Sequence, residues 1–308
     1  MLNAENQMHE NEGILLLEPF RGLAFQISGA LKRLGKRLNG LELPTASSAQ
    51  NSMFPSLHLD WTQADSNLQA LDKLGLSSAI LCLDPHLCSG DSIPEDRFRA
   101  LLRLAQSLVR ERPSLHLIWV LPLGIQPDWI RQIQNTHSFT TQILCPLLWG
   151  FGDQNLFDQA LNFYKNKPGA LLQSVASREV PMCFMGDVAG LVATLPHREP
   201  VFGKIIRIPA ALQNIQSFRL EFVRAFAPRP SFIERLAAKL ANERLGDGAC
   251  LALTLDYAPE SLGQIKVEDF ESLFPTALSE TSRVLKSAAK QYERNPDLKL
   301  HFPPGRAL

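Results

Sequence analysis

Three features are scarce in this chain of 308 residues: net charge, long apolar runs and cysteine. Its 31 lysine and arginine residues balance 31 aspartate and glutamate residues, so no overall field draws the chain to nucleic acid or anionic lipid. No uninterrupted apolar run approaches the roughly 18 to 20 residues of a membrane-spanning helix. We therefore expect neither nucleic acid nor a membrane among its partners.

The five cysteines show no spaced framework, which favours a reducing compartment over a disulfide-bonded protein. Cys82, Cys145 and Cys250 lie in apolar, strand-like runs, where a thiol packs as a small hydrophobic group. Cys82, His86 and Cys88 form a C-x3-H-x-C cluster, but no second ligand pair has matching spacing. We therefore predict no metal site.

The N-terminal stretch MLNAENQMHENEG is polar and acidic, which argues against a signal peptide. A hydrophobic fraction of 45% and a charged fraction of 20% are typical of a soluble globular protein. We therefore predict a soluble, cytoplasmic protein.

Strands and helices alternate through the first half of the chain. A short buried strand at Gly13–Leu17 precedes apolar residues at helical spacing, and Phe98–Val109 marks a strong amphipathic helix that Pro113 ends. This alternation predicts parallel βαβ units in an α/β fold with a doubly wound, mostly parallel sheet. The other strands are expected at Leu41–Leu43, Ser78–Leu83, Leu115–Leu121 and Thr141–Leu144, and the other helices at Leu23–Leu34, Asn67–Leu74 and Trp129–Ile133.

Beyond Gly150 the pattern is more mixed, which predicts a smaller C-terminal region of the substrate-binding or lid type. We divide the chain into a polar tail (1–12), a main domain (13–165, to which 183–208 returns) and this smaller region (166–182 and 209–308). Strands are expected at Lys204–Ile208 and Cys250–Leu255, and helices at Asn155–Phe163, Ser217–Phe226, Ser231–Leu245 and Pro275–Tyr292.

Four segments in one order resemble those of a known enzyme family. Leu59–Asp65, followed by Leu68 and Leu71, is similar to a G-D-x-x-D/S…L…A-L stretch. Thr141–Asp153 (TQILCPLLWGFGD) is similar to T-I-L-R-P-x-x-x-Y-G-P-G-D. Pro181–Leu191 (PMCFMGDVAGL) resembles P-x-x-F-I-H-V-D-D-V-A, and Gly203–Ile208 a following G-x-x-x-x-I strand.

Together these segments resemble the extended short-chain dehydrogenases/reductases (SDRs) and their NAD-dependent epimerase/dehydratase branch. Order and spacing agree over roughly residues 13–226. The resemblance implies a Rossmann-like sheet that binds a dinucleotide at the carboxyl ends of its strands.

The loop after the first strand departs from that family. There the family has G-x-x-G-x-x-G, whose glycines let the backbone approach a diphosphate. Here Glu18, Arg21 and Ala24 stand in the three glycine positions. The Glu18 carboxylate would repel a diphosphate, and Pro19 removes a backbone donor. Arg21 either binds phosphate directly, in a remodelled anion site, or pairs with Glu18 or faces solvent.

The residues that would catalyse the family's reaction are also missing. That reaction needs a Tyr-x-x-x-Lys motif and a serine or threonine. The three tyrosines are Tyr164, Tyr257 and Tyr292, and the interval Leu121–Gln142, where the motif belongs, contains neither tyrosine nor lysine. Leu121–Gly124 (LPLG) replaces the usual serine pair. We predict no catalytic residue of this kind.

Several polar residues remain as candidates for a remnant crevice. Asp84 and His86 follow a strand end, either as an acid/base pair, as in an unrelated hydrolase-like α/β protein, or as turn residues. Glu42 reads equally as an exposed strand residue and as a ribose-binding acid, and Asp187 is expected to cap a helix. The predicted crevice residues are Arg21, Gly22, Asp60, Asp84 and Pro146.

The sequence thus predicts a non-catalytic, SDR-like pseudoenzyme, a Rossmann-fold scaffold that binds another protein or a small nucleotide-like ligand. The C-terminal helix face of Leu278, Val284, Leu285 and Ala288 either docks a partner or packs on the domain. The alternative is a divergent NAD(P)-dependent epimerase, dehydratase or reductase acting on a nucleotide-linked or other small substrate. No cofactor is predicted; remnant binding of NAD(P) or another nucleotide, and a homodimer, are left open.

Overall fold

The structure is a computed structural model, which describes parts of the chain between residues 13 and 290. The described residues are 13–19, 22–42, 55–58, 71, 74–83, 95–123, 125–149, 179–209, 211–214, 265–274, 279, 283, 284, 286, 287 and 290.

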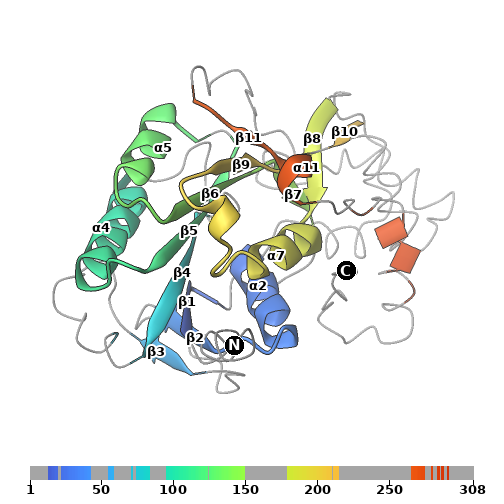
Figure 1. The fold of residues 1–308 in the computed structure, drawn as a ribbon. Coiled ribbons are helices and arrows are strands. Elements are labelled where there is room, and N and C mark those ends of the chain that lie inside the picture. The colour runs from blue at the N-terminus through green and yellow to red at the C-terminus, as the bar shows by residue number, and fades with distance from the viewer. Residues whose placement is uncertain are drawn as a thin grey trace, which may run out of the picture.

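An eight-stranded sheet runs through the centre of the molecule in the order β11-β9-β6-β5-β4-β1-β2-β3 (Figure 1). All neighbouring strands in it are parallel. The predicted doubly wound parallel sheet is therefore confirmed. Its strands are β1 (Gly13–Leu17), β2 (Leu38–Glu42), β3 (Ser56–His58), β4 (Leu76–Cys82), β5 (His116–Pro122), β6 (Thr140–Cys145), β9 (Ile205–Arg207) and β11 (Glu268–Asp269).

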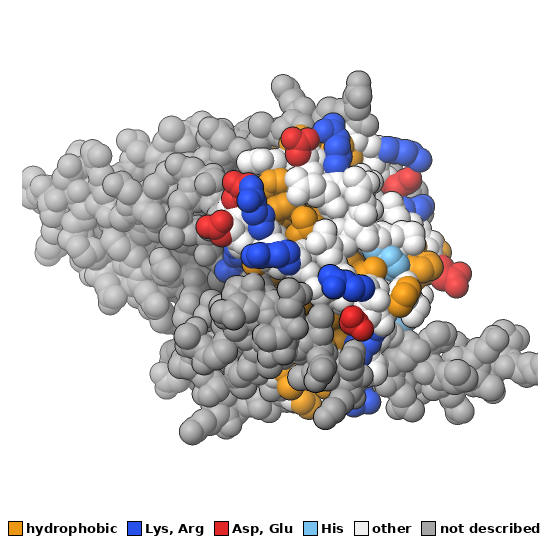
Figure 2. All heavy atoms as spheres, turned by 90° about the vertical axis from the view of Figure 1, so that its left-hand side faces the viewer, with side chains coloured by type: hydrophobic (Ala, Val, Ile, Leu, Met, Phe, Trp, Pro, Cys, Tyr) orange, Lys and Arg blue, Asp and Glu red, His pale blue; other side chains and the backbone are white. Residues whose placement is uncertain are grey.

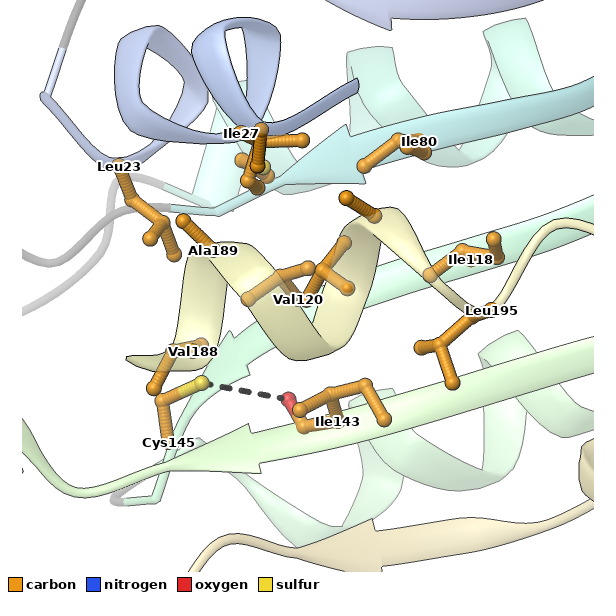
Figure 3. Close-up of a cluster of buried hydrophobic side chains, with 14 of the residues drawn as sticks. Leu23, Ile27, Ile80, Ile118, Val120, Ile143, Cys145, Val188, Ala189 and Leu195 are labelled. Carbon is orange, nitrogen blue, oxygen red and sulfur yellow. Dashed lines mark hydrogen bonds between the residues drawn. The ribbon is translucent and has the colours of Figure 1, made fainter. Parts of the chain in front are cut away.

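Helices cover both faces of this sheet. On one face α2 (Gly22–Arg33) lies beside α7 (Met185–Ala193), and their apolar residues meet the side chains of β4, β5 and β6 (Figure 3). On the other face lie α4 (Glu95–Glu111) and α5 (Pro127–Gln134). Because the sheet is covered on both sides, its strands are apolar runs rather than alternating patterns, as the fully buried β1 and β5 show.

The amphipathic pattern of α4 explains how that face packs. Phe98, Leu101, Leu104 and Leu108 recur three or four residues apart and are all buried. The ring of Phe98 stacks on Trp129 of α5, with centroids 4.1 Å apart and planes 2° from parallel. The two helices are therefore joined over the sheet by an aromatic contact.

A second, three-stranded sheet has the order β10-β8-β7. Its strands β7 (Leu147–Trp149) and β8 (Glu179–Phe184) are parallel, whereas β8 and β10 (Ala211–Asn214) are antiparallel. The remaining elements are a short 3-10 helix, η4 (Glu199–Val201), and α11 (Phe270–Leu273), which follows β11. Thus β11 brings residues 268–269 back to the main sheet beside β9.

Several boundaries differ from the prediction. Strand β2 begins at Leu38, where a strand was expected to begin at Leu41. Strand β4 ends at Cys82, where a strand was expected to end at Leu83. The strand expected at Lys204–Ile208 is shorter, at Ile205–Arg207. The elements expected at Asn155–Phe163, Ser217–Phe226, Ser231–Leu245 and Cys250–Leu255 lie outside the described residues. In the helix expected at Pro275–Tyr292, the described residues 283, 284, 286, 287 and 290 are helical, whereas Ser279 is not.

Charges of both signs are interspersed on the side of the molecule where α4 and α5 lie (Figure 2). Exposed ion pairs join Arg99 to Glu95 and Arg131 to Asp128 on these helices. Within the part of the chain that is described, no helix has the length and apolarity that crossing a membrane requires.

Candidate functional site

The strand order reverses between β1 and β4. From β1 the chain proceeds outward to β2 and β3, and then returns to place β4 on the other side of β1. In open α/β sheets ligands bind outside the carboxyl ends of the strands at such a reversal. The carboxyl ends of β1, β2 and β4 therefore form the candidate site.

Glu18 directly follows β1 and has an unusual backbone. Its φ is 46°, in the left-handed region that favours glycine, and only 7% of the residue is exposed. Its N–H donates to the carbonyl of Leu41 in β2 at 2.8 Å. The loop thus keeps a left-handed turn where the resembling family has a glycine, but it carries a buried carboxylate there.

That carboxylate is held by Arg97, in the first turn of α4. The Arg97 guanidinium donates to Glu18 Oε2 at 2.5 Å, and the exposed fractions of the two side chains are 21% and 8%. We had expected Glu18 to pair with Arg21 or to face solvent. The expectation that Glu18 faces solvent is wrong, because α4 brings Arg97 to the end of β1. A pairing with Arg21 lies outside the described residues.

The predicted crevice residues are only partly placed. Gly22 begins α2, close after β1, and also has a φ of 46°. Pro146 is buried between β6 and β7. Arg21, Asp60 and Asp84 lie outside the described residues, so the crevice they were predicted to form stays a prediction.

One residue at this edge, Arg97, was not identified from the sequence, and another, Glu42, was left between two interpretations. Glu42 is the last residue of β2, so an acidic residue does end the second strand. Arg97 was overlooked because it lies in an exposed-looking DRFR run. One signal was present: a cation in the first turn opposes the helix dipole, so it calls for an anionic partner.

The segment after β5 holds the position of the family's catalytic helix. The helix at that place in this chain is α5, which has 8 residues and is less than half as long as α4, with its 17 residues. Trp129, Ile130 and Ile133 of α5 are buried against the sheet. This helix packs the core and, by sequence, brings neither tyrosine nor lysine to the sheet edge.

Asp187 does not cap its own helix, contrary to the prediction. The residue before α7 is Phe184, with no side-chain cap, and Asp187 lies in the first turn. Its carboxylate accepts hydrogen bonds from the backbone and hydroxyl of Ser279. Burial raises the pKa of Asp187, and burial, followed by the Asp187 charge, raises the pKa of the Cys183 thiol to about 12.

A second polar cluster lies at the opposite, amino-terminal edge of the sheet. The hydroxyl of Thr141 donates to the carbonyl of Val201 at 2.8 Å, so its oxygen accepts from His116 Nε2, also at 2.8 Å. Burial, followed by the nearby His197 and His137, lowers the pKa of His116 to about 3. His116 is therefore a neutral structural residue at the end of the sheet away from Glu18.

Among the described residues, no group of three or more His, Cys, Asp or Glu side chains is arranged to hold an ion. Among the described cysteines, Cys82, Cys145 and Cys183 are buried thiols without disulfides.

Solved enzyme structures share this architecture. A dTDP-glucose 4,6-dehydratase from Bacillus anthracis in complex with NAD aligns at a TM-score of 0.60 and 8% identity, over 93% of this chain and 98% of the dehydratase. L-threonine dehydrogenase from Clostridium difficile aligns at 0.63 and 10% identity, over 92% and 99%. A nucleoside-diphosphate-sugar epimerase from Staphylococcus aureus aligns at 0.59 and 13% identity, over 89% and 99%.

These likenesses confirm, at the level of fold, the resemblance to extended SDR and epimerase/dehydratase proteins. No protein-family model matches the sequence, and no curated protein matches it. At such low identity the fold is shared, and residue roles do not transfer with it.

Two positions at this edge bear on the binding of a dinucleotide. Glu42, at the end of β2, stands where dinucleotide folds carry the acidic residue that binds ribose. At the end of β1, however, the buried carboxylate of Glu18 takes the place of a glycine that lets a diphosphate approach. The family's way of binding a diphosphate is therefore not available at this loop.

Proposed function

We propose that this chain is a nucleotide-binding protein, a divergent relative of the NAD(P)-dependent epimerases, dehydratases and reductases. One observation carries the proposal: the strand order reverses beside β1, and the adjacent β2 ends on the acidic Glu42. In dinucleotide folds the ligand lies across this reversal, with an acidic residue about 20 positions after the phosphate-binding turn on the ribose. Glu42 follows the loop at about that spacing, counted from Gly22.

The class of ligand is inferred from the solved structures that share this fold. One structure of this fold contains NAD, and another is named for nucleoside-diphosphate sugars. Either ligand carries a ribose and a diphosphate, so NAD(P) and nucleotide-linked sugars are the classes to test. These likenesses support a divergent enzyme better than the predicted pseudoenzyme, since nothing in them indicates loss of catalysis.

The test is a titration of the purified chain with NADH, NADPH and dTDP-glucose. Nicotinamide fluorescence and thermal unfolding report binding, and a ligand at 100 times its Kd stabilises the fold by about 2.7 kcal/mol. We expect Glu42→Gln to weaken the binding of NADH, whose adenosine ribose has a free 2′-hydroxyl, at least tenfold. Glu111→Gln, the same change at the exposed far end of α4, serves as the control. Absence of binding by all three ligands contradicts the proposal.

A second candidate is the same fold working by binding alone, as a scaffold. The observation that favours it is α5, which packs its three buried residues on the sheet and includes neither tyrosine nor lysine. The two candidates separate on turnover. Conversion of any candidate substrate to product, followed by product analysis because an epimerase or dehydratase returns its hydride and leaves no net change in the nicotinamide, contradicts the scaffold, whereas tight binding without turnover supports it.

A further inference from the structure

We infer that Arg97 is an anion-binding residue of this sheet edge and that Glu18 is its internal competitor. A phosphate or diphosphate group of a nucleotide would then bind Arg97 by displacing the Glu18 carboxylate. The identity of the ligand rests on the proposed function, but the contact between Arg97 and Glu18 does not.

The placement of the pair is the first argument. Glu18 follows β1, and Arg97 lies in the first turn of α4, the helix that comes after β4. The pair therefore joins the segments that follow the two strands between which the strand order reverses. This is where a ligand of an open α/β sheet binds. The ion pair is therefore at the site and not at a remote part of the surface.

The chemistry of the two side chains is the second argument. A guanidinium binds carboxylate and phosphate through the same planar set of N–H donors, so one anion can replace the other. Arg97 keeps 21% of its side-chain exposure, whereas Glu18 keeps 8%. The arginine is thus reachable from solvent, and the anion that it binds comes from the chain itself.

The backbone at Glu18 is the third argument. A residue other than glycine at a φ of 46° is disfavoured, and such positions concentrate where a side chain has a role. Glycine would satisfy this turn without strain. The glutamate instead supplies a charge to an arginine that lies at the positive end of α4.

The experiment compares wild type with Glu18→Gln, which removes the charge, and with Glu18→Gly, which suits the positive φ. Pyrophosphate, ADP and NADH are the probes, with Kd measured by calorimetry. We expect both variants to bind pyrophosphate and ADP at least tenfold more tightly than wild type. The double variant Glu18→Gln/Arg97→Gln should lose that gain, and Glu111→Gln, which also removes one negative charge, should show none.

Equal Kd values for wild type and both Glu18 variants, or a gain that survives in the Arg97 double variant, would overturn the inference. NADH binding that is the same in wild type and Glu18→Gln overturns it while leaving the proposed function standing. Arg97-dependent binding of pyrophosphate without any binding of NADH or dTDP-glucose upholds it while the proposed function fails. Circular dichroism and urea unfolding establish that each variant is folded.

Discussion

The carboxylate of Asp187 accepts two hydrogen bonds from one residue, Ser279, from its backbone N–H at 2.6 Å and from its hydroxyl at 2.8 Å. Asp187 lies in the first turn of α7, and Ser279 lies 92 residues further along the chain. This half-buried contact holds Ser279 against α7, one of the helices that cover the sheet.

Replacing Asp187 by alanine should lower the free energy of unfolding by about 1–3 kcal/mol, because the Ser279 N–H loses its acceptor. Asp187→Asn should cost less, since its amide oxygen still accepts from the N–H and its NH2 group can donate to the hydroxyl. Urea unfolding measures both, and amide exchange at Ser279 should become faster in the alanine variant. Unchanged exchange would show that this contact does not hold the segment.

The two Glu18 variants should differ in stability. Glutamine leaves Arg97 without a charged partner, which costs about 1–3 kcal/mol. Glycine loses the same pair but relieves a left-handed backbone, worth about 1–2 kcal/mol for an L-residue. Glu18→Gly should therefore unfold at a higher urea concentration than Glu18→Gln. The reverse order would show that the positive φ is not a source of strain.

Stability should rise with pH between about 3 and about 6.5 because of His116, whose pKa in the fold is lowered to about 3. The unfolded chain takes up the proton near pH 6.5 and the folded chain only near pH 3, so the neutral imidazole stabilises the fold above this window. One such group changes the free energy of unfolding by up to about 1.4 kcal/mol per pH unit within it.

His116→Gln supplies the matched comparison, because glutamine can still donate to Thr141 but does not titrate. The carboxylates of the chain titrate in both proteins, so the difference between the two pH profiles isolates His116. We expect a flatter profile for the variant. Identical profiles would contradict the buried neutral state of this histidine.

Truncation of Phe98 should be among the costly core substitutions. Phe98 is 1% exposed and stacks on Trp129, so Phe98→Ala should cost about 3–5 kcal/mol. Leu34→Ala, at a residue that is 44% exposed, should stay within about 0.5 kcal/mol. Chemical unfolding of both variants checks this. A small loss for Phe98→Ala would show that α4 and α5 are not coupled through the aromatic stack.

The sheet could be predicted because its signals are local. Apolar runs such as Gly13–Leu17 and Leu115–Leu121, separated by helical spacing, follow from the covering of a parallel sheet on both faces. The boundaries were less certain. Leu38–Gly40 was missed as strand, since Asn39 and Gly40 do not have the composition of a strand and only the pairing with β1 makes it one.

By itself the sequence determined the doubly wound architecture, the unusual loop after β1 and the lack of a Tyr-x-x-x-Lys motif, because each is written in neighbouring residues. Only the tertiary structure decided the partners: Glu18 with Arg97, 79 residues apart, and Asp187 with Ser279. Such pairs depend on which helices return to which strand ends. The neighbours of a charged residue in the sequence can indicate that it needs a partner of opposite charge. They do not specify which distant side chain provides that partner.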